Sequence, residues 1–105
     1  MPVQSFGKVT VTLGGTPVRV TSTVTNCTQL YIQALAANTG KIYVGLSNLV
    51  KATLVGALAV LPIPSAALIP TYIPWSLAQG GIDLSTIWLD ADVNGEGVLI
   101  SYLVI

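Results

Sequence analysis

The residues that could carry chemistry are concentrated in one acidic run near the end of the chain. Residues 90–97 have the sequence DADVNGEG, which places side-chain oxygens at alternate positions before a glycine, as at the start of an EF-hand calcium loop. The match ends at the twelfth position, where such a loop has a bidentate glutamate and this chain has Ser101. Strands are expected on both sides of the run, whereas an EF-hand needs helices. We interpret the run as a solvated hairpin turn, with calcium binding as the alternative, and assign no metal ligands.

Catalytic arrangements are difficult to build from this sequence. The chain has no histidine and only four carboxylates, so no nucleophile can be paired with a base. Asp90 and Asp92 lie two residues apart on one predicted strand face, a spacing that suits a glycosidase pair only within a cleft. Tyr72, Trp75 and Trp88 could stack a sugar, although aromatic residues among apolar neighbours are more often core or subunit contacts. We expect no catalytic residue, no cofactor and no enzymatic activity.

Cysteine use and the N-terminal sequence suggest neither disulfides nor secretion. Cys27 is the only cysteine, so a disulfide within the chain is impossible, and we expect a small buried side chain rather than a reactive thiol. It belongs to Asn26-Cys27-Thr28, a glycosylation pattern that also arises by chance and needs a secretory route. The first residues, MPVQSFGK, do not have the pattern of a signal peptide.

The composition favours association. Hydrophobic residues make up 52% of the chain and charged residues 8%, with four cations balancing four acids, whereas about a quarter of residues are usually charged. Copies of such a chain repel one another weakly. Without a basic stripe, nucleic-acid binding is not expected. Residues 42–61 have the length of a membrane span, but Lys51 lies near their centre, so we expect no membrane partner.

The first half of the chain predicts a series of short strands. Alternating residues predict strands at 8–13 and 17–21, joined as a hairpin across Gly14-Gly15. Further strands are predicted at 29–36 and 41–46, on either side of a loop at 38–40. Their predicted inner-face residues are Leu30, Ile32, Ala34, Ile42, Val44 and Leu46.

The middle of the chain is less clearly patterned. From Ser47 to Gln79 the composition favours loop and strand, with a short helix from Asn48 to about Leu61 as the alternative. Residues 62–74 contain four prolines among large apolar side chains. Proline cannot donate to a β-ladder, so this segment is predicted to be an edge, a bulged strand or an extended arm on a neighbouring chain.

The last quarter of the chain, residues 82–105, predicts a β-hairpin that turns at Asn94-Gly95, a pair that tolerates the positive φ angles of a type I′ turn. The predicted cross-strand pairs are Val93 with Glu96, Ala91 with Val98, Leu89 with Ile100, and Ile87 with Tyr102. The opposite face comprises Leu84, Thr86, Trp88, Asp90, Leu99, Ser101, Leu103 and Ile105. This second face is too apolar to contact water alone, so we expect a partner to cover it.

These elements together predict an all-β fold. About seven or eight short strands separated by glycine, asparagine and proline are typical of an antiparallel β-sandwich, jelly-roll-like or Ig-like. At 105 residues the chain is expected to form a single domain, 1–105. The sequence leaves the strand order open.

Two runs of the sequence resemble a known class of protein. NTGKIYVGLSN at 38–48 and GGIDLSTIWLDADVNGEGVLISYLV at 80–104 are similar to runs in small structural proteins encoded among the head genes of tailed bacteriophages. Those proteins have a similar order of NTG-IYVG, IDLS-I-D and GEGV, followed by a strand with a tyrosine. The resemblance covers somewhat under half of the chain and includes no catalytic motif. It implies a β-sandwich on the outside of the capsid, as a decoration or cement protein, or occasionally in the tail.

Composition and resemblance together predict a virion structural protein. We expect it to be made in the cytoplasm of a host bacterium, to form a homo-oligomer, expected to be a trimer, and to bridge major capsid subunits on the capsid surface. The predicted interface residues are Trp88, Leu99, Leu103, Ile105, Ile63, Ile69, Tyr72 and Trp75. The alternatives are a glycan-binding module of a tail or adhesin and a membrane-active protein built on residues 42–61.

Overall fold

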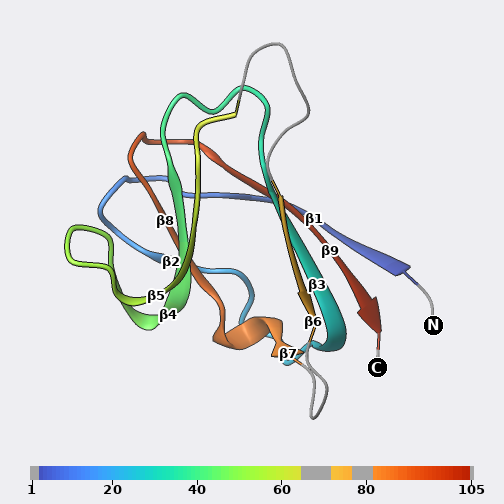
Figure 1. Cartoon of the computed structure of the whole chain (residues 1–105). Helices are drawn as coiled ribbons and strands as arrows, with labels where there is room; N and C mark the ends of the chain where they lie inside the picture. The colour runs from blue at the N-terminus through green and yellow to red at the C-terminus, as the bar shows by residue number, and fades with distance from the viewer. Residues whose placement is uncertain (1–2, 65–71, 77–81, 105) are drawn as a thin grey trace.

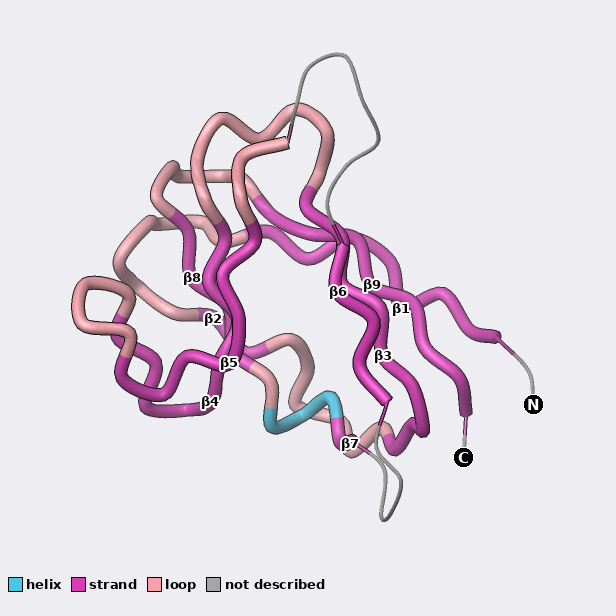
Figure 2. Tube along the Cα trace, viewed as in Figure 1, coloured by secondary structure: helices cyan, strands magenta, loops and turns pink. Residues whose placement is uncertain are grey.

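A computed structural model describes residues 3–64, 72–76 and 82–104 and shows two antiparallel β-sheets packed face to face (Figures 1 and 2). The strands are β1 (Val3–Thr10), β2 (Val18–Arg19), β3 (Asn26–Ala34), β4 (Ile42–Val50), β5 (Val55–Leu61), β6 (Tyr72–Ser76), β7 (Ile82–Asp83), β8 (Trp88–Ala91) and β9 (Gly97–Val104). A short 3₁₀-helix, η1 (Leu84–Thr86), precedes β8. The predicted all-β sandwich is confirmed.

The strand order is that of a jelly roll. One sheet, which we call sheet A, has the order β1-β9-β3-β6, with β7 also paired to β3; the other, sheet B, has the order β2-β8-β4-β5. The pairs β1–β9, β2–β8, β3–β6 and β4–β5 are all antiparallel. The chain is therefore arranged as one long hairpin, with its closed end at β4–β5, that rolls up so that its segments alternate between the two sheets.

The core lies between the sheets and is filled from alternate strand positions. Fully buried residues include Leu30 and Ile32 of β3, Ile42 and Val44 of β4, and Ile100 of β9. Burying one such aliphatic side chain contributes about 1.5–3 kcal/mol to folding, so this layer dominates the stability of the domain. The prediction that these β3 and β4 residues face inward is confirmed.

The prediction that Leu46 also faces inward is wrong. Its side chain is 41% exposed, and Leu49 takes the buried position instead. The pairing of β4 with β5 loses register between Gly45 and Val50, where residues 46–49 of β4 lie opposite Gly56 alone. Extra residues in one strand interrupt its alternation and turn side chains to the other face of the sheet.

The predicted terminal hairpin is wrong. β8 pairs with β2 and β4 in sheet B, whereas β9 pairs with β1 and β3 in sheet A, so the chain crosses between sheets at residues 92–96. Gly95 has a positive φ of 81° but Asn94 does not, so a type I′ turn is absent. Val11 pairs with the turn instead: it accepts from the Gly95 N–H at 2.8 Å and donates to the Glu96 carbonyl at 2.8 Å.

The predicted alternation of these strands is nevertheless confirmed for part of one face, although Val93 on that face is 38% exposed and Tyr102 is half-buried. Ile87, Leu89, Val98 and Ile100 are buried as expected, but Leu89 belongs to sheet B, Val98 and Ile100 belong to sheet A, and Ile87 lies between η1 and β8. Two residues that we assigned to the outer face are also buried. Leu84 belongs to η1 and is part of the core, and Asp90 is 1% exposed beneath a loop that includes Gly15.

The predicted hairpin across Gly14-Gly15 is wrong for a similar reason, because β1 pairs with β9 and β2 pairs with β8. These glycines serve a crossing between sheets. A Cβ on Gly14 would lie 2.7 Å from the Ala91 carbonyl oxygen, and Gly15 has a φ of 93°. Both features favour glycine over other residues here.

In the middle of the chain, β5 confirms strand over helix for residues 55–61. No helix in the described part of the chain is long and apolar enough to cross a membrane. β6 lies at the edge of sheet A and contains Pro74 opposite Tyr31, so the last part of the proline-rich segment forms an edge strand, one of the predicted forms. Residues 65–71 lie outside the described residues.

Candidate functional site

The acidic run is used to hold loops together. The buried carboxylate of Asp90 accepts hydrogen bonds through Oδ1 from the N–H groups of Gly15 and Ala91, each at 2.8 Å. Asn94 binds the same loop, because its Oδ1 accepts from the Gly14 N–H at 2.7 Å. These two side chains attach the β1–β2 crossing to the β8–β9 crossing. The sequence-based interpretation of Asp90 as a solvated turn residue is therefore wrong.

Asp92 has a different environment from Asp90. Its exposed carboxylate accepts a hydrogen bond from the Tyr43 hydroxyl at 3.2 Å and lies 3.5 Å from the Lys51 Nζ. The pKa of Tyr43 is raised above its ordinary value, mainly by partial burial and secondly by this hydrogen bond. Lys51 also donates to the Ala91 carbonyl at 2.9 Å. Asp90 and Asp92 thus serve different segments, and Asp90 is too buried to meet a glycoside.

The loop at residues 38–40 contacts the start of β9 through side-chain hydrogen bonds. We call this contact the NTG–GEG clamp; its residues are Asn38, Thr39, Gly40, Glu96 and Gly97. Asn38 Nδ2 donates to the Gly97 carbonyl at 2.8 Å, while the Glu96 carboxylate accepts from the N–H groups of Thr39 at 2.6 Å and Gly40 at 2.9 Å. Burial alone would raise the pKa of Glu96, but these N–H groups stabilise the carboxylate and bring its pKa below the ordinary value. The two runs that carry the phage resemblance are therefore in direct contact.

The geometry does not favour a metal site. Within residues 3–64, 72–76 and 82–104, no group of three or more histidine, cysteine, aspartate or glutamate side chains could hold a metal ion. In a calcium loop, side-chain oxygens at these positions would face the ion. Here the side-chain oxygens of Asp90, Asn94 and Glu96 accept hydrogen bonds from backbone N–H groups of other loops. Binding a cation there would first require breaking these loop contacts.

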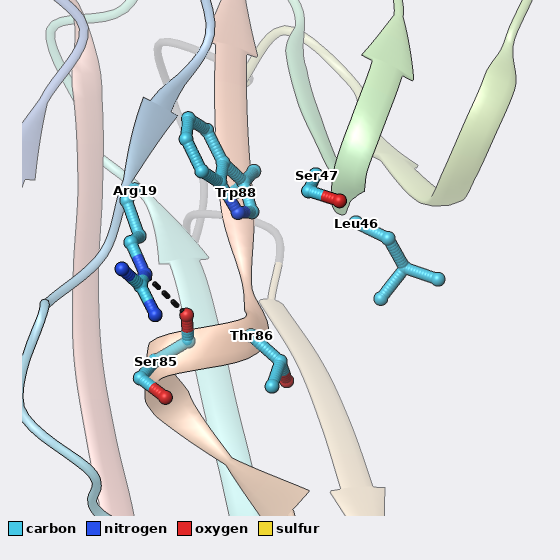
Figure 3. A pocket seen from close by; sticks show the side chains of 6 residues that line it. All are labelled: Arg19, Leu46, Ser47, Ser85, Thr86 and Trp88. Atoms are coloured by element: carbon cyan, nitrogen blue, oxygen red, sulfur yellow. Dashed lines mark hydrogen bonds between the residues drawn. The ribbon is translucent and has the colours of Figure 1, made fainter.

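An open hollow of about 510 Å³ lies at sheet B beside η1 (Figure 3). Its lining residues come from β2, β4, η1 and β8, and they are Arg19, Leu46, Ser47, Ser85, Thr86 and Trp88. Arg19 and Trp88 are directly opposite each other on β2 and β8. The Arg19 Nε donates to the Ser85 carbonyl at 2.6 Å, which holds the guanidinium at the edge of the hollow.

This hollow combines groups that a sugar could use. The half-buried Trp88 indole offers an apolar surface, Ser47 and Thr86 offer hydroxyls, and Arg19 offers a cation for a carboxylate. The Arg19 charge is partly offset by Asp83. The pKa of Asp83 is lowered mainly by the N–H groups of Thr25 and Ser85, and to a smaller extent by Arg19. The other two aromatic residues predicted to stack a sugar, Tyr72 and Trp75, belong to β6 of the other sheet.

Among the residues whose burial is described, seven exposed apolar side chains lie along the β4–β5 hairpin and the segment that follows it. We call this set of residues the β4–β5 apolar edge; its members are Leu46, Val50, Leu54, Val55, Leu58, Val60 and Ile63. Of these seven residues, the sequence analysis assigned only Ile63 to an interface. The run VGALAVL of β5 carries no charge and does not alternate with polar residues, and this was the feature that could have identified it.

The predicted interface residues whose side chains are described do not all belong to one sheet. Leu99, on β9 of sheet A, is 43% exposed, and Leu103 on the same strand is half-buried. Trp88 belongs to sheet B, and Ile63 follows β5. Tyr72 and Trp75 lie in β6, whose side chains are not described, while Ile69 and Ile105 lie outside the described residues.

Cys27 has the role expected of it. Its side chain is buried, the thiol donates to the Ile82 carbonyl at 3.3 Å, and burial raises its pKa above the ordinary value. A thiol in this setting carries little thiolate at neutral pH and is a poor nucleophile.

Comparison of the chain with family models, with curated proteins and with solved structures gave no match.

Proposed function

We propose that this chain is a non-enzymatic structural protein of a tailed-phage particle, a decoration protein that binds the outside of the head and bridges major capsid subunits. The observation that carries the proposal is the β4–β5 apolar edge on a chain with no net charge. Large exposed apolar surfaces of this kind mark sites of protein association. A shell of repeated subunits offers such a surface a permanent partner.

The use of polar side chains supports a structural role. Asp83, Asp90, Asp92 and Glu96 are the only carboxylate side chains of the sequence, and all four are engaged in contacts within the chain. The acids therefore stabilise a loop network and do not converge on a substrate site. Such a network favours a rigid domain that presents its surface to other subunits.

The resemblance supports the same role. The NTG–GEG clamp explains why the two resembling runs occur together, because Asn38 and Glu96 each bind the other run. A Cβ on Gly97 would overlap the Val9 carbonyl, so this glycine permits the close approach of β1 and β9. The shared pattern therefore reflects contacts that maintain a fold. The proteins that it resembles are encoded among the head genes of tailed phages.

The proposal is tested by adding the purified chain to phage heads that were assembled without it. We expect the chain to co-sediment with the heads and to saturate at a fixed ratio to the major capsid protein. Binding to purified tails alone, or an absence of binding at saturating concentration, would contradict a head decoration role.

A glycan-binding module of a tail or adhesin is the second candidate, and the hollow beside Trp88 favours it. The test is calorimetric titration with glucuronic acid and with glucose. If the hollow binds sugars, glucuronic acid binds more tightly than glucose, and Arg19→Gln removes that preference. Lys8→Gln is the matched control, because Lys8 is also exposed on a strand but lies in sheet A. Equal losses in both variants would indicate non-specific attraction of an anion.

A further inference from the structure

Asn94 is followed by a glycine, and this pair has a chemistry of its own besides its place in the turn. In an Asn-Gly pair the glycine nitrogen can attack Cγ, the carbonyl carbon of the asparagine side chain, because glycine has no Cβ to obstruct the approach. Of the four asparagines in the sequence, only Asn94 precedes a glycine; the others are Asn26, Asn38 and Asn48. One position of the chain is therefore suited to this reaction.

Both reacting groups of the pair are held by one segment, the β1–β2 crossing at residues 11–17. The Gly95 N–H, whose nitrogen would be the nucleophile, donates to the Val11 carbonyl at 2.8 Å. Asn94 Oδ1 accepts from the Gly14 N–H at 2.7 Å. Val11 is fully buried, so a base in solvent has little access to the proton that its carbonyl accepts. While both hydrogen bonds are formed, the nitrogen keeps its proton and the asparagine side chain is not free to rotate toward it.

We infer that Asn94 is a site of spontaneous deamidation, and that opening of the β1–β2 crossing sets its rate. When the crossing opens, the Gly95 nitrogen forms a bond to Cγ and the Cγ–Nδ2 bond breaks. The proton of the N–H leaves with Nδ2 as ammonia, and a five-membered succinimide ring remains. Water then adds to either ring carbonyl carbon and opens the ring, which gives aspartate or isoaspartate. Water is the only co-reactant, so the reaction is independent of the proposed function.

The two products differ in their effect on the loop contact. Aspartate keeps an oxygen that can accept from the Gly14 N–H, and it adds one negative charge to a chain whose formal net charge is zero. Isoaspartate also adds a methylene to the main chain between residues 94 and 95, which displaces the Gly95 N–H from the Val11 carbonyl. The isoaspartyl form therefore loses one of the two hydrogen bonds that protect the unmodified site.

Mass-spectrometric peptide mapping of the whole chain, incubated at mildly alkaline pH, tests the inference. We expect Asn94 to deamidate at least about tenfold more slowly in the folded chain than in guanidinium chloride, because the reactive state must first break two hydrogen bonds. Asn26, Asn38 and Asn48 are internal controls and should stay intact in both samples over the same time. Gly95→Ala should suppress the reaction in the unfolded chain, because its Cβ obstructs the attack. Equal rates at Asn94 in the folded and unfolded chain would overturn the inference, as would an unreactive Asn94 in guanidinium chloride.

Two destabilised variants separate opening of the crossing from unfolding of the whole domain. Asp90→Ala removes the acceptor of the Gly15 N–H and so loosens the crossing, whereas Ile100→Ala leaves a cavity in the core between the sheets. Compared at equal free energies of unfolding, Asp90→Ala should deamidate at Asn94 about fivefold faster than Ile100→Ala, the effect of one hydrogen bond lost from the crossing. Far-UV circular dichroism checks that both variants are folded. Equal rates in the two variants would show that only global unfolding exposes the site, and would overturn the role of the crossing.

Discussion

The two aspartates of the acidic run are expected to differ sharply in their contribution to stability. Asp90 is 1% exposed and accepts two N–H groups at 2.8 Å. Asp90→Ala leaves the Gly15 and Ala91 donors without their acceptor, at about 1–3 kcal/mol for each buried group. We expect a total loss of about 2–4 kcal/mol in the free energy of unfolding, since part of the cost is recovered by water entering beside Gly15.

Asp92→Ala is the matched comparison. This carboxylate is exposed and makes one ion pair at 3.5 Å together with the Tyr43 hydrogen bond, so its removal is expected to cost less than about 1 kcal/mol. Urea denaturation followed by circular dichroism measures both variants. With a slope of about 1–2 kcal/mol per molar urea, Asp90→Ala lowers the midpoint by roughly 2 M, and Asp92→Ala by a fraction of that.

Added calcium tests whether Asp90 and Asp92 hold loops together or bind a cation. If they hold loops together, millimolar calcium shifts the urea midpoint of neither the wild type nor the two variants. Equal losses in the two variants, or a wild type stabilised by calcium in a way that both variants abolish, would refute the assignment of Asp90 to the loop network.

Other parts of the structure lead to further predictions. Ile100→Ala, at a fully buried position, should cost about 2–5 kcal/mol of folding free energy by chemical denaturation, whereas Leu99→Asp should leave the far-UV spectrum intact; the reverse order would contradict the assigned faces of β9. The pKa values of Asp83 and Glu96 lie below the ordinary 3.8 and 4.5, so the stability they provide is present above these values and is lost as pH falls through the lower folded values. Melting temperature should therefore fall steeply below about pH 4.5, and less steeply in Glu96→Gln; identical acid profiles would argue against the clamp. Cys27 should react with a thiol reagent only after urea is added, and rapid labelling of the folded chain would show that it is accessible.

The alternation of side chains was predictable because it depends on local geometry. Strands place successive residues on opposite faces, so Leu30, Ile32, Val98 and Ile100 were assigned to the core from sequence alone. The prediction was wrong at Leu46, where a register shift between β4 and β5 reverses the alternation. Gly45 is the only residue of the local sequence that indicates a possible shift of register here.

Strand pairing could not be predicted, because it depends on contacts between distant segments. Asn94-Gly95 is a strong hairpin pattern, yet Val11 takes the backbone hydrogen bonds of the turn, and the flanking strands enter different sheets. In a sandwich a turn between two strands can lead across the core as well as along the sheet. The sequence contains no local feature that separates these two outcomes.

The role of the acidic run was misjudged for the same reason. Its acids were assigned to solvent because they adjoin a turn, whereas Asp90 and Glu96 bind backbone N–H groups of loops that lie far away in the sequence. Four of the interface residues proposed from sequence, Trp88, Leu99, Leu103 and Ile105, were selected on the assumption of a terminal hairpin with a second apolar face. Once β8 and β9 separate into different sheets, that face no longer exists as one surface, and the β4–β5 apolar edge becomes the stronger candidate.

The most direct test of the central proposal is quantitative mass spectrometry of purified tailed-phage particles, with heads and tails separated, from a phage whose genome is found to carry this sequence. A head decoration protein is expected in the head fraction at a fixed ratio to the major capsid protein, and it should be released by mild denaturant before the shell itself dissociates. Absence of the chain from purified heads, or its recovery only with tails or with soluble host protein, would contradict the account.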